Sequence, residues 1–136
     1  FYSWYGIHGF EPYVTVMGTG AEKVSCFRSA TDDVINIAYA NGRMGQLHLL
    51  RNAWTYSGYI LPEKPKDKKN PLVVSDGYPG YEPLLREIVK FFKTGVVPFP
   101  PEETLEIFAL MEAAEMSAKR GGAPVTLEEA LAEARK

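Results

Sequence analysis

The chain has 136 residues and a formal net charge of -2, with 46% apolar and 24% charged residues. This composition is ordinary for a globular protein, and the length predicts a single domain covering 1–136. The near-neutral charge argues against a nucleic-acid partner. No apolar run approaches the roughly 18 residues that span a bilayer, so we also expect no membrane partner.

Cys26 is the single cysteine, which excludes an internal disulfide and favours a reducing, cytoplasmic compartment. The chain opens at Phe1 with aromatic residues, and it has neither an initiating Met nor a helix N-cap there. We therefore expect a piece of a longer protein, although a removed leader would account for the missing Met equally well.

The first predicted element is a helix that runs to Met17, contains Pro12 and ends at Gly18-Thr19-Gly20. One face of this helix carries aromatic rings with one imidazole and one carboxylate: Phe1, Trp4, Tyr5, His8 and Glu11. Histidine can move a proton near neutral pH, and a carboxylate one turn away can fix its tautomer. Trp4 and Tyr5 could line a pocket for a sugar or polyol ring. The alternative is a core histidine packed among aromatic side chains.

Alternating polarity then predicts five strands joined by short turns: 23–29, 34–39, 44–50, 54–61 and 72–75. Asn41-Gly42 is a hairpin signal, because a type I′ turn needs positive φ at both central residues. We expect an antiparallel meander with one packed face and one freer face. The polar, proline-bounded stretch 62–71 is predicted to be a surface loop.

The last third is predicted to be helical, at 81–94, 101–120 and 126 to about 135. The first of these helices carries an apolar stripe: Leu84, Leu85, Ile88, Phe91 and Phe92. Thr126 and Glu129 form a capping box at the start of the last one. Strands and helices are thus segregated, which predicts an α+β fold with helices packed on one face of an open antiparallel sheet.

Few other residues in the sequence suggest a catalytic, nucleotide-binding or metal-binding role. The Gly18-Thr19-Gly20 stretch follows a helix and precedes a strand, which is the reverse of the dinucleotide-binding order. His8, His48 and Cys26 have no metal-ligand spacing, so no metal site is predicted. A Cys26 nucleophile paired with a histidine is an alternative, but a mid-strand cysteine favours a buried apolar role. His8 remains the leading site residue.

The stretch Gly6-Ile7-His8-Gly9-Phe10-Glu11 resembles the G-x-H-x-x-D stretch of the Gfo/Idh/MocA family of nicotinamide-dependent oxidoreductases. Segments 16–20, 95–108 and 120–125 are similar to the C-terminal half of bacterial members, in the same order. Where the family usually has Asp, this chain has Trp4 before the histidine and Glu11 after it. Glu63-Lys64-Pro65 matches the family's catalytic E-K-P tripeptide in letters, but it lies in a predicted loop, so that role is not carried over.

The resemblance implies a C-terminal α+β domain for substrate binding and assembly. In the parent enzyme an N-terminal Rossmann domain would bind NAD or NADP, and this chain alone would hold no cofactor and be inactive. His8 would be the catalytic group acting on a sugar, polyol or related hydroxy compound, with Trp4, Tyr5 and Glu11 at the substrate. The implied partners are the Rossmann domain and a second copy bound through the sheet face. The alternative is a stand-alone dimerisation or binding module without catalysis.

Overall fold

The computed structural model describes residues 2–53, 56–62, 72–74 and 80–135, and for 3–4 and 72–74 it describes the backbone. The chain divides into two compact units, one formed by 1–52 with 99–136 and the other by 53–98. That 1–136 folds as one domain stays a prediction.

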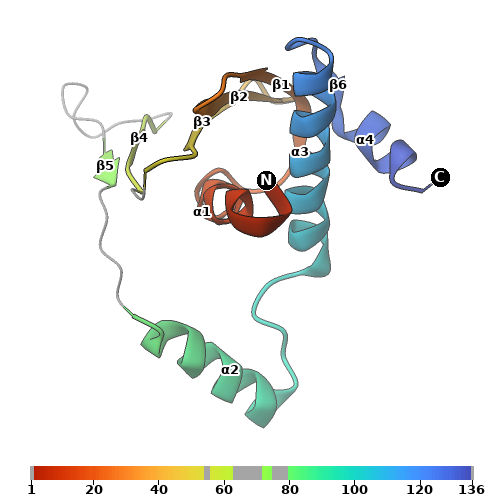
Figure 1. Ribbon diagram of the computed structural model, residues 1–136. Helices are drawn as coiled ribbons and strands as arrows, with labels where there is room; N and C mark the ends of the chain where they lie inside the picture. The colour runs from red at the N-terminus through yellow and green to blue at the C-terminus, as the bar shows by residue number, and fades with distance from the viewer. Residues whose placement is uncertain (1, 54–55, 63–71, 75–79, 136) are drawn as a thin grey trace. The chain divides into compact units, whose positions relative to one another are not determined.

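The first unit combines helices with an antiparallel sheet. Its elements are a π-helical turn Tyr2–Gly6, α1 Ile7–Met17, β1 Ala21–Arg28, β2 Asp32–Tyr39, β3 Met44–Leu50, α3 Pro101–Lys119, β6 Val125–Thr126 and α4 Leu127–Glu133. The strand order is β3-β2-β1-β6, and all pairs are antiparallel. The predicted α+β class with an open antiparallel sheet is confirmed, and Figure 1 shows α1 and α3 on the same side of the sheet.

Burial alternates along the strands, and this alternation sets the two faces of the sheet. On β2, Ile35 and Ile37 are fully buried, and Val24 and Cys26 continue this packed face on β1. The residues between them are exposed or half-buried, as expected for a sheet covered on one side. The helices bury their apolar residues, Phe10 of α1 among them, in the same core.

The sheet differs from the predicted five-strand meander at both ends. The expectation that 54–61 and 72–75 extend it is wrong, because β4 Gly58–Ile60 and β5 Leu72–Val74 pair with each other in the second unit. The other edge is formed by β6, whose Val125 pairs with Val24. A strand of two residues is too short to show an alternating pattern, so periodicity could not predict it.

The first helix ends at Met17 as predicted, but its α-helical part begins only at Ile7, after the π-helical turn. Pro12 therefore lies inside α1 rather than at its start. Gly9 faces β3 so closely that a Cβ there would overlap Leu49 Cδ2, and the leucine side chain would have to shift. This close approach explains a glycine inside a helix, where it otherwise lowers stability.

The second unit holds β4, β5 and α2 Glu82–Thr94, which matches the predicted helix 81–94 to one residue. The helix α2 is capped by Gly95, which has a left-handed φ of 70°. The N–H of Gly95 donates a hydrogen bond to the carbonyl of Phe91. None of its residues is buried. The beginning of the predicted strand at Trp54 and the loop with Glu63-Lys64-Pro65 lie outside the described residues.

The C-terminal helices agree closely with the sequence. α3 ends at Lys119, one residue before the predicted end, and Gly121 and Gly122 follow it with positive φ. The Thr126 hydroxyl accepts a hydrogen bond from the Glu129 N–H at 3.1 Å, which confirms half of the capping box.

Candidate functional site

The predicted site lies on the outward face of α1. The inward face buries Phe10, Tyr13 and Val14, and the helical spacing places His8 and Glu11 outside that face. The side chains of His8 and Glu11 are 50% and 52% exposed. The alternative of a core histidine is therefore wrong, since the imidazole is open to an approaching molecule.

Two neighbours hold the imidazole. His8 Nδ1 lies 3.3 Å from Glu11 Oε2, and the ring of Tyr5 stands edge-on to it with centroids 5.8 Å apart. A neutral imidazole that donates Nδ1–H to the carboxylate presents a lone pair on Nε2. Within the described part of the chain no hydrogen bond reaches Nε2. This geometry allows His8 to accept a proton from a bound hydroxyl.

The structure thus brings three of the four predicted residues together: Tyr5, His8 and Glu11. The side chain of Trp4 lies outside the described residues, so its predicted role at the substrate is not tested. Tyr5 is 47% exposed.

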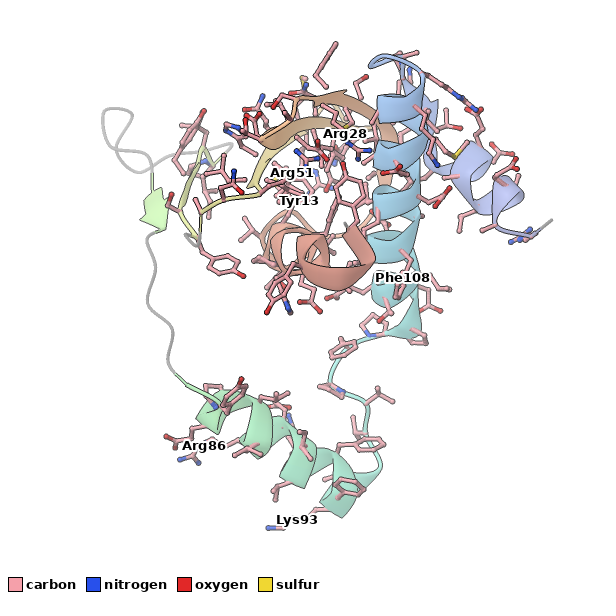
Figure 2. All side chains as sticks on the ribbon, viewed as in Figure 1. Tyr13, Arg28, Arg51, Arg86, Lys93 and Phe108 are labelled. Carbon is pink, nitrogen blue, oxygen red and sulfur yellow. The ribbon has the colours of Figure 1, made fainter. Side chains whose placement is uncertain are left out.

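Behind this helix lies a buried carboxylate that the sequence did not single out. Asp33 is fully buried, and its oxygens accept hydrogen bonds from the hydroxyl of Tyr2 at 2.6 Å, Arg28 Nε at 3.0 Å and Arg51 Nη2 at 2.6 Å. Arg28 also donates to Glu115 of α3 at 2.8 Å. Figure 2 shows Arg28 and Arg51 in the layer between the sheet and the helices. Two part-exposed cations therefore balance the fully buried carboxylate of Asp33 and the part-exposed carboxylate of Glu115.

Hydrogen bonding keeps this network ionised. Burial alone would raise the pKa of Asp33, but the donors Arg28, Tyr2 and Arg51 outweigh burial and lower it below its ordinary value. The pKa of Glu115 is lowered chiefly by its hydrogen bond from Arg28. Because each charge is paired, the network fixes the strand ends and the turn that leads to His8, rather than offering a free acid or base.

Cys26 is not a nucleophile in this arrangement. Burial raises the pKa of its thiol, and the sulfur lies 3.4 Å from the hydroxyl of Tyr2. Its backbone N–H donates to Ser117 Oγ at 2.9 Å, and that hydroxyl donates to the carbonyl of Ala123 at 2.7 Å. In the sheet Cys26 lies in register with Leu47 of β3, through Ile35 of β2, and His48 is the next residue, whose side chain points to the opposite face. The alternative of a Cys26–His48 pair is therefore wrong.

His48 has a different partner. Its Nε2 lies 2.6 Å from Asp32 Oδ2 on the open face of the sheet, and Ser29 donates to the other oxygen of the same carboxylate. These hydrogen bonds lower the pKa of Asp32, and the bond from Ser29 has the largest effect. The carboxylate stands between the hydroxyl and the imidazole, which is the wrong order for activating a serine.

The glycine-rich loop after α1 does not present a phosphate site. The N–H groups of Gly20 and Ala21 both donate, at 2.8 Å, to the two carboxylate oxygens of Glu106 on α3. Donors that could hold an anion are therefore already satisfied by the chain itself.

The remaining features add no competing site. A shallow depression runs along α2, but every residue that lines it belongs to this one helix, so it has no opposing wall. Among the described residues there is no group of three or more potential metal ligands. In the same described ranges no helix is both long and apolar enough to span a membrane.

Comparison with models of known protein families finds no match. Comparisons with curated proteins and with solved structures also find none.

Proposed function

We propose that this chain is the substrate-binding and assembly domain of an NAD(P)-dependent oxidoreductase that acts on a sugar, polyol or related hydroxy compound. The observation that carries the proposal is the half-exposed imidazole of His8, oriented by Glu11 within the stretch that resembles the family motif. A histidine kept in a core would have removed this support.

His8 exchanges the proton of the reaction. Its Nε2 accepts the proton of the substrate hydroxyl as the carbinol becomes a carbonyl, and Glu11 stabilises the imidazolium that forms. Tyr5 offers an apolar ring beside the imidazole for the C–H face of the substrate. A nicotinamide nucleotide supplies the hydride acceptor, and it would be held by another domain, because Glu106 occupies the glycine-loop donors of this chain.

The open face of the sheet supports the assembly part of the proposal. Phe27 and Met44 are 58% and 73% exposed on it, beside a polar pair in which Gln46 donates to Asn36 at 2.8 Å. Such a mixture of apolar and hydrogen-bonding groups is typical of protein interfaces. The same face favours the alternative, a stand-alone dimerisation or binding module without catalysis.

Two measurements test the proposal. Calorimetric titration of NAD or NADP into the 136-residue chain should give no binding heat, and a clear micromolar isotherm would contradict it. The reading frame upstream of Phe1 should encode a strand followed by G-x-G-x-x-G and a later strand-end E-K-P. A frame that begins at this domain and lacks those elements would favour the binding-module alternative.

A further inference from the structure

Tyr2, the first residue of the π-helical turn before α1, is anchored in the core by three contacts. Its hydroxyl donates to Asp33 Oδ2 of β2 at 2.6 Å, a length typical of a hydroxyl bound to an ionised carboxylate. Its ring stands edge-on to Phe10, with centroids 5.5 Å apart, and the guanidinium of Arg28 lies 5.4 Å from the same ring. These contacts come from α1, β1 and β2, so the start of the turn is fixed from three elements.

The turn Tyr2–Gly6 differs in geometry from the helix that follows it. Its hydrogen bonds span five residues instead of the four of an α-helix, which rotates its residues about the helix axis relative to those of α1. Both ends of the turn are buried, whereas Tyr5 between them is 47% exposed. Single π-helical turns are rare and occur frequently at functional sites. The conformation of this turn therefore decides where Tyr5 stands.

Tyr5 connects the turn to the candidate site. Its ring stands edge-on to the imidazole of His8 from one turn before it, and Glu11 holds Nδ1 from one turn after it. The imidazole is thus held from two sides, and only the Glu11 side lies within α1 itself. The backbone of one turn therefore sets two contacts together, that of the Tyr2 hydroxyl with Asp33 and that of the Tyr5 ring with His8.

We propose that Tyr2 is a positioning residue for His8. Its hydroxyl bond to Asp33 holds the π-helical turn in the form that sets the Tyr5 ring against the imidazole, and so fixes the direction of His8 Nε2. The consequence for catalysis rests on the proposed function. The positioning itself is a property of this chain and is measurable without a cofactor-binding domain.

Nuclear magnetic resonance of the 136-residue chain tests the positioning. His8 and His48 are its two histidines, and His48→Asn assigns their imidazole signals. Tyr2→Phe keeps the ring and removes the hydroxyl, so the nuclear Overhauser contact between the Tyr5 and His8 rings should be lost and the His8 signals should shift. Tyr13→Phe removes a buried hydroxyl of α1 that faces β3, and this matched control should leave both observables unchanged.

Tyr5→Leu tests whether the effect passes through Tyr5. The residue is half-exposed, so the variant should fold, and it should shift the His8 signals by itself. In this background Tyr2→Phe should add no further shift, because the contact through which it acts is gone. Val125→Ala, which opens a cavity in the core at β6, controls for a general loss of stability. His8 signals that do not respond to Tyr2→Phe or to Tyr5→Leu, or that shift as far in Val125→Ala, would overturn the proposal.

The protein encoded by the complete reading frame provides the kinetic test. Tyr2→Phe should lower kcat about tenfold and leave the KM for the nucleotide unchanged, because a misplaced proton acceptor slows the chemical step. Full activity of Tyr2→Phe in an enzyme that His8→Asn inactivates would refute the positioning role. If His8→Asn is itself fully active, the proposed function fails, and the resonance measurements still decide whether Tyr2 positions the imidazole.

Discussion

Asp33 Oδ1 lies 2.6 Å from Arg51 Nη2, in a core where the carboxylate has no contact with solvent. Asp33 stands near the start of β2 and Arg51 directly follows β3, so one ion pair joins two strand ends. Tyr2 reaches the same carboxylate from the turn before α1. The position of the helix that carries His8 therefore depends on a charge buried under the sheet.

Removing this charge should strongly destabilise the first unit. Asp33→Ala leaves Arg28 and Arg51 without their buried partner, and we expect a loss of about 3 kcal/mol in the free energy of unfolding. Urea denaturation followed by circular dichroism measures it. Arg86→Ala, in an ion pair whose side chains are largely exposed, is the control and should cost less than about 0.5 kcal/mol. Comparable losses for both variants would show that burial of the network contributes nothing.

The same network predicts an acid-sensitive stability. The pKa of Asp33 is lowered in the folded chain relative to its ordinary value of 3.8, so its contribution is complete above that pH. The contribution is lost as the pH falls below about 4 and through the folded pKa, and Glu115 acts in the same direction.

The free energy of unfolding should therefore stay nearly constant from about pH 7 to 5 and fall steeply below pH 4. Asp33→Asn should flatten this fall, because its amide does not titrate. Denaturant titrations at several pH values provide the test, and identical acid slopes for the variant and the parent would contradict the assignment.

Gly45 on β3 has no room for a side chain. A Cβ there would meet the hydroxyl of Tyr13, so Gly45→Ala should destabilise the fold by about 1–3 kcal/mol. Two ring atoms of Tyr13 overlap the same position at 2.5 and 2.7 Å, so Tyr13→Leu, which removes the hydroxyl and both of these atoms, should recover part of the loss in the double variant, with a coupling of at least about 0.5 kcal/mol. Gly58→Ala, where no atom stands within 4 Å, is the matched control. Additive effects in the thermal melts would rule out a direct clash.

The sequence predicted what depends on local pattern. The return strand at 44–50 and the capping of α4 follow from periodicity and capping chemistry, and the structure confirms them. The hairpin also forms, but the predicted type I′ turn is wrong, because only Gly42 has a positive φ and Asn41 does not. The face of α1 with His8 and Glu11 also follows from helical spacing. The exposure of this face could not be predicted in the same way, because whether a helix face is buried depends on which elements pack against it.

The Asp33 network was missed although its signal was present. Arg28 continues the alternation of Val24 and Cys26 along β1, although its side chain stays part-exposed, and extending β2 by one residue places Asp33 on the packed face. A cation and an anion at inward positions of neighbouring strands indicate a buried pair. Arg51 and Glu115 come from distant parts of the chain, so only the folded arrangement could add them.

The most direct measurement compares the two histidines in the protein encoded by the complete reading frame. If His8 exchanges the substrate proton, His8→Asn should lower kcat for nicotinamide reduction at least about a hundredfold and leave nucleotide affinity unchanged. His48→Asn, on the open face of the sheet and away from α1, should keep the parental kcat. Equal rates for His8→Asn and the parent enzyme would contradict the assignment of His8 as the catalytic group.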